Sequence, residues 1–298
     1  MARHEEAKRI AYVAIPQDTL AIGGKCTMIY HWLYGQYGWI DLLTATAAFG
    51  LVLYGVVASL SYYVYFVRYR ERFVPAYRAS GGKIRRAVLW SVYGLLGNAM
   101  LVLPVQLLIV YGHFPLYYDI RACGPLYLVA SFVGAVVFAE TSIYWIHRAL
   151  HTGFLYRILH VHHHRFREPT PYASFAFHPL DSFSQSVPYH VYAFFVPMYA
   201  WAYLALIAFA MIWSLMIHDQ VRWVPFGFVN HTGCHTAHHW YFRYNYGNYF
   251  TFWDRLCGTY YDPAGLPDEF GASKQALLSG WLPRRRGSNC SRPALDQH

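Results

Sequence analysis

Histidine residues gather in two short stretches of the sequence. The stretch "HRALHTGFLYRILHVHHHRF" at 147–166 holds six of the 17 histidines, and "NHTGCHTAHHWYF" at 230–242 holds four. They form one H-x-x-x-H box and two H-x-x-H-H boxes, namely His147 and His151, then His160, His163 and His164, then His235, His238 and His239. Residues three or four positions apart share a face of a helix, so each box is expected to direct its imidazoles to one side.

These boxes have the chemistry of a metal site. Imidazole is the commonest metal ligand in proteins at neutral pH, and it suits iron, zinc and copper. The three boxes supply eight ligands, more than one tetrahedral ion takes. We therefore expect two metal ions that share one site. A surface histidine tract that merely scavenges metal would not repeat one helical spacing at the ends of apolar segments.

Three further residues are associated with the boxes by position. His218, in "MIHDQ", ends an apolar region as His147 does, and we expect it to be a ninth ligand. Asp219 beside it is expected either to orient an imidazole N–H or to cap the chain. Glu140 lies seven residues before His147. An ionisable residue at membrane depth indicates a functional site, but a buried hydrogen-bond network is the equal alternative.

Other histidines are expected to stay outside the site. His162 falls on the opposite side of its helix from His160 and His164, although it lies inside the box. Isolated histidines usually have structural or exposed positions, and this applies to His4, His31, His113 and His298.

The elements that position the boxes are those of a membrane protein. The chain of 298 residues is 56% hydrophobic and only 13% charged, whereas a soluble domain has about 25% charged residues. The apolar regions 40–66, 87–112 and 125–146 are each long enough to cross a hydrocarbon core of about 30 Å, and 187–217 is longer still. We predict an all-α integral membrane protein, whose transmembrane helices carry a cytoplasmic helical cap with a histidine-rich dimetal site. The net charge of +9 does not indicate nucleic acid, because the basic residues lie in loops beside apolar runs.

The loop 67–86 predicts the orientation of the chain. It carries seven Lys or Arg residues against one Glu, and the positive-inside rule places such a loop in the cytoplasm. The third apolar region then returns the chain to the cytoplasm at His147. A single crossing by 187–217 would place the third box on the opposite side. We therefore expect this region, which contains Pro188 and Pro197, to form a helical hairpin in the membrane.

We divide the chain into four parts. An N-terminal segment (1–39) precedes the transmembrane helices (40–146), and the histidine-box catalytic region (147–262) includes the membrane hairpin. Residues 263–298 are expected to be a flexible tail. The N-terminal segment has no long apolar run, so no cleavable signal peptide is expected. The five cysteines show no C-x-x-C spacing and indicate no thiolate metal site.

The order of the boxes across the apolar segments resembles the fatty acid hydroxylase/sterol desaturase superfamily. The runs "PTPYASFAFHPLDSFSQSVPYH" (169–190), "IWSLMIHD" (212–219) and "CHTAHHWYFRYNYGNYFTFWDRLCGTY" (234–260) are similar to its sterol C5-desaturase (lathosterol oxidase) branch. The resemblance covers about 140–262. It implies a membrane-bound di-iron enzyme that uses O2 to remove two vicinal hydrogens from a Δ7 sterol, which gives a Δ5,7-diene.

The resemblance also implies the ligands and the partners. His178, in "AFHPLD", is the proposed tenth ligand, whereas His231 is not a ligand. Gln220 stands where the branch commonly has Gly. A separate electron donor is implied, such as cytochrome b5 or a ferredoxin with its reductase. The membrane is that of the endoplasmic reticulum in a eukaryote and the inner membrane in a bacterium. The implied ligands are His147, His151, His160, His163, His164, His218, His235, His238 and His239.

Two alternatives stay open. The same metal centre could serve a hydroxylase or oxidase of another lipid, such as a carotenoid, a hopanoid or a fatty acyl chain. A histidine-rich metal transporter or a haem electron carrier is disfavoured, because a transporter places its ionisable residues deep in several spans. For a sterol, the expected lining of an apolar slot is aromatic, and it includes Tyr172, Phe175, Phe177 and Tyr246.

Overall fold

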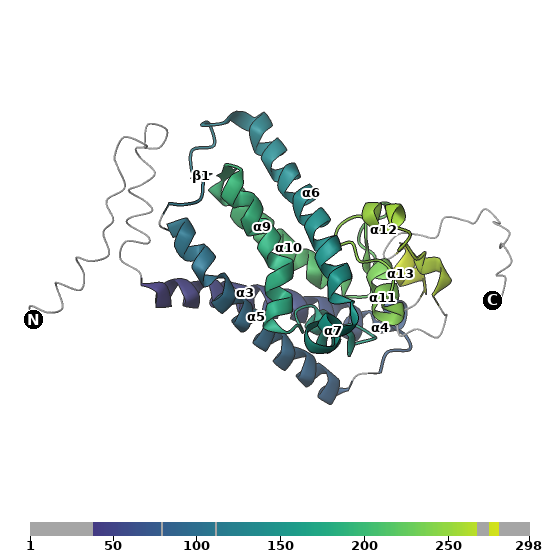
Figure 1. Ribbon diagram of the computed structural model, residues 1–298. Coiled ribbons are helices and arrows are strands. Elements are labelled where there is room, and N and C mark those ends of the chain that lie inside the picture. The colour runs from purple at the N-terminus through teal and green to yellow at the C-terminus, as the bar shows by residue number, and fades with distance from the viewer. Residues whose placement is uncertain (1–37, 79, 111, 267–273, 280–298) are drawn as a thin grey trace, which may run out of the picture.

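The computed structural model describes residues 38–78, 80–110, 112–266 and 274–279 (Figure 1). Almost all regular structure in this part of the chain is helical. The predicted all-α class is therefore confirmed. The N-terminal segment up to residue 37, which includes His4 and His31, lies outside the described residues.

Four helices of the described chain are long and apolar enough to cross a membrane. They are α3 (Trp39–Tyr62), which continues as the π-helical segment Tyr63–Arg68, α5 (Gly81–Val110), α6 (Gly124–Leu150) and α10 (Ala200–Ile217). Much of their apolar surface is exposed, including Val52, Leu89 and Val133. Exposed aliphatic side chains on long helices are expected where lipid, rather than water, is the solvent.

A fifth helix, α9 (Pro179–Phe195), packs between α5 and α6 (Figure 1). The chain leaves α9 at Val196, whose extended backbone (φ −115°, ψ 121°) precedes Pro197. A residue before proline is disfavoured in the helical conformation, so the helix ends there. Met198–Tyr199 (β2) then pairs with Leu116–Tyr117 (β1) before α10 turns back. The 187–217 region is thus two helices; the depth of this pair in a membrane stays a prediction.

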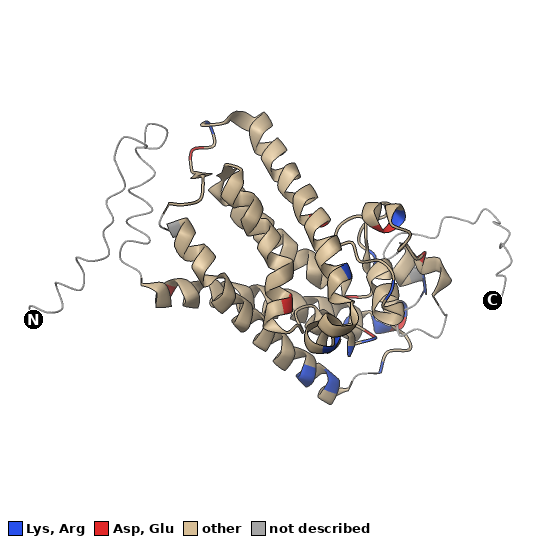
Figure 2. Ribbon diagram, in the orientation of Figure 1, with Lys and Arg blue, Asp and Glu red and all other residues tan. Residues whose placement is uncertain are grey.

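The C-terminal ends of α6 and α10 and the N-terminal end of α9 meet at one end of the bundle, and short helices form a cap there (Figure 1). Lys and Arg of the described chain also lie at this end, with the exception of Arg121 near β1 (Figure 2). The cap elements are α4 (Arg70–Phe73), α7 (Gly153–Leu155), η3 (Tyr156–His160), α8 (Val161–His164), η4 (Pro171–Ala173), α11 (Thr232–Tyr241), α12 (Phe252–Leu256), η5 (Pro263–Gly265) and α13 (Lys274–Ser279).

Two glycines of α5 allow the segment that follows the second box to pack closely against this helix. A Cβ atom on Gly94 would lie 2.7 Å from the carbonyl oxygen of Phe175, and one on Gly97 would lie 2.4 Å from the ring of Pro179. Neither position has room for a larger residue. This close contact positions Phe177, whose ring stacks on His163 at a centroid distance of 4.1 Å.

The expected division of the chain differs from the structure at two places. The boundary proposed at 146 falls inside α6, which runs to Leu150. The tail expected to be flexible from 263 contains η5 and α13, and Ala276 and Leu277 are buried in a cluster with Phe73 and Val221. These apolar side chains pack α13 against the cap, while the flexibility of the tail stays a prediction. Residues 280–298 lie outside the described chain.

Candidate metal centre

In the part of the chain that the structure describes, nine buried or half-buried histidines form two adjacent groups. In each group the nitrogen atoms that could bind an ion lie within 4.8 Å of one another. These are the nine histidines that the sequence and the resemblance indicated as ligands. The five-histidine group is His147, His151, His160, His164 and His238. The four-histidine group is His163, His218, His235 and His239.

Each H-x-x-H-H box divides its histidines between the groups, instead of directing all of them to one point as the sequence predicted. In the second box the residues at positions i and i+4 join the five-histidine group and the residue at i+3 joins the other. The third box has the reverse arrangement. On an α-helix, i+4 lies about 40° to one side of i and i+3 about 60° to the other. Each of these boxes therefore supplies histidines to both groups, and its helix lies beside the space between the two groups.

The ends of the long helices supply the other ligands. His147 lies in the last turn of α6, and His151 is the residue that caps it. His218 occupies the equivalent capping position of α10. The second box begins at the last residue of the π-helical segment η3 and continues into α8. Single-turn π-helices occur frequently at functional sites, where they rotate a side chain relative to a regular helix.

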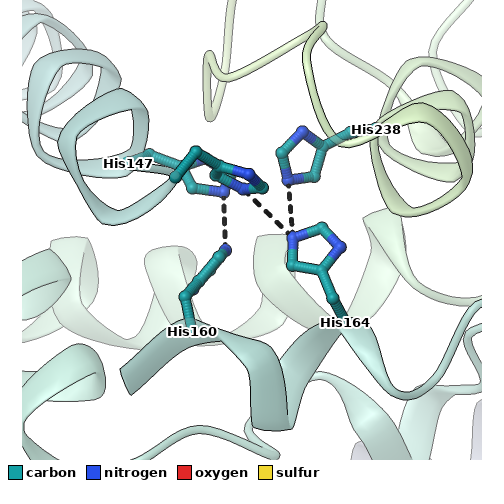
Figure 3. Close-up of side chains that lie close together, drawn as sticks. His147, His160, His164 and His238 are labelled. Carbon is teal, nitrogen blue, oxygen red and sulfur yellow. Dashed lines mark hydrogen bonds between the residues drawn. The ribbon is translucent and has the colours of Figure 1, made fainter. Parts of the chain in front are cut away.

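The nitrogen–nitrogen distances fit the ligands of a shared ion. Neighbouring Nε2 atoms lie 3.1 Å apart between His147 and His160, and 3.1 Å apart between His164 and His238 (Figure 3). In the four-histidine group, His218 Nε2 lies 2.9 Å from Nε2 of His235. Two nitrogens bound at about 2.0–2.1 Å to one ion are about 2.8–3.4 Å apart for angles between right and tetrahedral. Both groups thus have the spacing of a metal site.

The hydrogen bonds made by the Nδ1 atoms explain why a cation between the Nε2 atoms is favourable. His147 Nδ1 donates to the carbonyl oxygen of Tyr246 at 2.9 Å, and His160 Nδ1 donates to Asp181 Oδ2 at 2.7 Å. With these protons on Nδ1, both neutral rings carry a lone pair on Nε2, and the two lone pairs face each other. A positive ion between them removes this repulsion. Hydrogen bonds at Nδ1 are the usual way in which proteins orient metal-binding histidines.

Burial keeps five imidazoles of the cap neutral. It lowers the pKa of each ring well below its usual value, and repulsion between neighbouring rings lowers it further. A neutral ring is the form that binds a metal. The rings so affected are His163, His164, His235, His238 and His239.

Two buried carboxylates hold the loop that orients His147 and His238. His238 Nδ1 donates to the carbonyl oxygen of Tyr244 in the same loop, at 2.7 Å. Glu140 Oε2 accepts from the backbone N–H of Tyr249, at 2.6 Å, and of the residue before it. Asp254 accepts the backbone N–H of the two residues that follow Asn245. Glu140 therefore belongs to a structural hydrogen-bond network and touches no imidazole of the centre.

Asp219 does not orient an imidazole. Its Oδ1 accepts from the backbone N–H of Val221 at 2.9 Å, and its Oδ2 accepts from the indole N–H of Trp223 at 2.6 Å. The Nδ1 of the neighbouring His218 donates instead to the carbonyl oxygen of Ser214. Of the two alternatives for Asp219, its contacts are those of the capping one. The chain turns away after Ile217, and this carries the carboxylate off the metal side.

Sequence reasoning missed the carboxylate that does contact the centre. Asp181 accepts from His160 and is completely buried. It lies in the run "HPLDSF", where the nearby His178 was chosen instead. His178 joins neither group: it caps α9, where its Nδ1 accepts from the backbone N–H of Leu180 at 3.2 Å. The signal that could have identified Asp181 is an acidic residue in the first turn of an apolar helix.

Within the described residues, the histidines expected to be excluded lie outside both groups. His162 stacks on Trp90 at a centroid distance of 4.2 Å, on the far side of its helix from the centre. His231 caps α11 by accepting from the backbone N–H of Gly233. The helix-face argument therefore holds for His162, which lies inside a box.

A small cavity, with room for about two water molecules, lies against both histidine groups. Phe177 lines this cavity as expected, and Tyr246 packs against His147, but Tyr172 and Phe175 pack on α3 instead. The lining residues come from α6, η3, α8, α9, α10, α11 and adjoining loops: Ile143, His147, His160, His163, Phe177, Gln185, Ser214, Ile217, His218, His235, Gly247 and Asn248.

Comparison with known proteins identifies relatives over most of the chain. Residues 132–259, which include all nine histidines, match the family model described as fatty acid hydroxylase. The chain is 40% identical over 225 residues to the Delta(7)-sterol 5(6)-desaturase erg3B of Aspergillus fumigatus, covering 75% of this chain and 66% of that protein. It is 38% identical over 262 residues to the lathosterol oxidase of Homo sapiens, covering 86% and 87%. No solved structure matches the chain.

Proposed function

The chain belongs to the fatty acid hydroxylase family, within its sterol C5-desaturase group, and on this premise we propose that it is a membrane-bound, O2-dependent sterol C5-desaturase with two iron ions. The observation that carries the proposal is the division of nine histidines into two groups beside a cavity that faces the membrane helices. The reaction balances when a Δ7 sterol, O2, two electrons and two protons give a Δ5,7-diene and two water molecules.

The two groups would hold the iron ions, which supply the activation of O2 and the abstraction of hydrogen. The protein's own residues orient and enclose this chemistry. Hydrogen bonds from Nδ1 to Tyr246, Tyr244 and Ser214 hold the rings of three ligands. Phe177 stacks on His163 and lines the cavity. Apolar packing of this kind keeps water away from the reacting carbon atoms.

The substrate enters the cavity from the bilayer. Ile143 of α6 and Ile217 of α10 offer apolar surface, while Gln185 of α9 and Asn248 offer polar groups. The C3 hydroxyl of a sterol is separated from C5 by only one ring carbon, so the hydroxyl must enter the same space as the reacting bond. Polar groups in a mainly apolar pocket fix the orientation of such a ligand.

Electrons come from a separate donor protein that approaches the five-histidine group. His151 is half-buried, whereas the other eight histidines are buried. The ring of Phe242 lies 4.9 Å from that of His164 and 6.1 Å from that of Tyr156. The Arg167 guanidinium lies over Phe242, 5.7 Å from the ring centre. We call the exposed Arg157, Arg167 and Arg243 around this point the donor surface.

The cap faces the cytoplasm, since the basic residues of the described chain concentrate there. Thiol labelling tests this orientation. Cys123 is exposed near β1, at the end of the bundle away from the cap. With the remaining cysteines replaced by Ser, an impermeant reagent should label Cys123 from outside and a cysteine introduced at Arg157 only from the cytoplasm. Labelling of both from one side would contradict the proposed topology.

Expression in a yeast blocked at sterol C5-desaturation tests the activity. Extracted sterols should regain the near-ultraviolet absorption of a conjugated diene, which the Δ7 substrate lacks. The His163→Ala variant, expressed at the same level, should produce no diene. Accumulation of a hydroxylated lipid without diene would replace the desaturase by a lipid hydroxylase with the same metal centre.

A further inference from the structure

Asp181 connects a metal-site histidine to the cavity. Its Oδ2 lies 2.7 Å from Nδ1 of His160, and its Oδ1 accepts a 2.8 Å hydrogen bond from Nε2 of Gln185. Gln185 lines the cavity. None of the surface of Asp181 is exposed. Both carboxylate oxygens are therefore engaged, one by a ring of the five-histidine group and one by a side chain at the substrate side.

The charge of Asp181 is unusual within the centre. The nine imidazoles are neutral ligands, so two divalent ions would bring about four positive charges into a buried site, where uncompensated charge is costly. Nδ1 atoms of His147, His218 and His238 donate to uncharged backbone carbonyls. Within the described ranges, Asp181 is the one carboxylate that is hydrogen-bonded to an imidazole of either group.

We propose that Asp181 is a positioning residue that makes the five-histidine group the tighter of the two metal sites. A carboxylate on Nδ1 fixes the tautomer of His160 and raises the basicity of its Nε2. It also places a negative charge next to one group and not the other. The hydrogen bond from Gln185 holds the carboxylate in this orientation. The inference rests on the two-metal centre of the proposed function, but not on the sterol substrate.

Titration of the metal-free, full-length protein in detergent with Co²⁺ tests the inference without turnover. Visible absorption of Co²⁺ bound to imidazole reports the occupancy of each site. The parent protein should bind two ions with different affinities. Asp181→Asn keeps the size of the side chain but removes its charge, and should weaken the tighter site about 10- to 100-fold, the usual effect of losing such a partner.

Asp219→Asn is the matched control. Asp219 is also fully buried and follows a ligand of the centre, yet it bonds only to Val221 and Trp223. Its substitution should lower thermal stability and leave both Co²⁺ affinities unchanged. Asp181→Glu, which restores the carboxylate, should recover part of the lost affinity. Circular dichroism of each metal-free variant checks that the fold is retained.

Double variants identify the site that Asp181 serves. His239→Ala removes a ligand of the four-histidine group, so the remaining ion should bind tightly, and adding Asp181→Asn should weaken it 10- to 100-fold. Replacing His164 and His238 together by Ala removes two ligands of the five-histidine group and keeps the four-histidine group intact, and there Asp181→Asn should change the affinity by less than about threefold.

Equal weakening in both backgrounds, or no weakening in the His239→Ala background, would overturn the inference. A parent protein that binds fewer than two Co²⁺ ions would instead remove the two-metal centre on which the proposed function depends. Two ions with normal affinities in Asp181→Asn would leave that centre intact and reject only the role of Asp181.

Discussion

The five-histidine group and the four-histidine group are built from the same sequence patterns, but their surroundings differ. The five-histidine group includes the half-buried His151 and is backed by the carboxylate of Asp181. The four-histidine group is buried throughout, and its His218 is backed by a backbone carbonyl. The motif therefore specifies the ligand type, while the neighbours of each ring make the two sites unequal in charge and in access.

The difference has a chemical consequence. Three of the four members of the four-histidine group line the cavity, namely His163, His218 and His235, but only His147 and His160 of the other group do so. A metal ion with fewer protein ligands keeps more coordination positions open for reactants. We therefore expect the four-histidine group to lie closer to the reacting carbon atoms, and the five-histidine group to receive the electrons.

Loss of a ligand from either group should have the largest effect. His163→Ala and His238→Ala each remove one ligand, from different groups, and each should abolish turnover. His163→Ala, which leaves three ligands in its group, should also reduce the iron content from about two ions to about one. His162→Ala is the matched control and should retain most activity, because its ring stacks on Trp90. Iron analysis and diene formation are the measurements. An inactive His162→Ala beside an active His163→Ala would refute the assignment of helix faces.

Removal of both ions should destabilise the cap more than the membrane bundle. A ligand that binds only the folded state at 100 to 1,000 times its dissociation constant stabilises it by about 3–4 kcal/mol. Chelation should therefore lower the melting temperature and increase hydrogen exchange in α8 and α11, while α5 and α9 keep their protection. Exchange that increases equally in all four helices would show that the metals hold the whole fold and not the cap.

Filling the cavity from two sides tests which group lies nearer the substrate. Ile217 precedes His218, and Ile143 lies one helical turn before His147, and both line the cavity. Ile217→Phe should lower kcat/KM about tenfold and Ile143→Phe less, which corresponds to about 1.4 kcal/mol for the larger effect. Both variants should keep their iron. A larger effect of Ile143→Phe would reverse the assignment of roles.

Neutralising the donor surface should have a smaller effect, and only on electron delivery. Arg167→Gln combined with Arg243→Gln should slow reduction by an acidic donor about two- to fivefold at low ionic strength, and the difference should vanish at high salt. A small chemical reductant should reduce both proteins at the same rate. Arg121→Gln, at the opposite end of the bundle, is the control. Equal rates with the protein donor at low salt would place its binding site elsewhere.

The smallest change is expected at the turn that follows the four-histidine group. Gln220 has a left-handed backbone (φ 62°), and its Nε2 donates to the carbonyl oxygen of Pro169. Gln220→Gly would relieve about 1–2 kcal/mol of backbone strain but lose a hydrogen bond of about 0.5–1.5 kcal/mol. Its free energy of unfolding should therefore stay close to that of the parent. Gln220→Ala keeps the strain and loses the bond, so it should be the less stable variant in denaturant unfolding.

The sequence by itself determined the helical membrane class and the nine histidines that gather in the two groups. These features follow from local patterns. Long apolar runs form membrane helices because their backbone groups must bond internally. Histidines three and four positions apart share a region of one helix surface wherever that helix packs. The same rule excluded His162, because its side chain points to the opposite side.

Only the tertiary structure decided how the histidines divide and what surrounds them. The partner of His160 lies 21 residues away, and Glu140 holds backbone groups 108 and 109 residues away. Asp219, Asp181 and Glu140 are all acidic residues near apolar segments. Composition alone could not show that Asp219 caps a turn, that Asp181 bonds to a histidine of the centre, or that Glu140 holds a loop. The order of α13 likewise depends on contacts with Phe73 and Val221. Contacts between segments distant in the chain depend on how complete helices pack, and no local spacing encodes that packing.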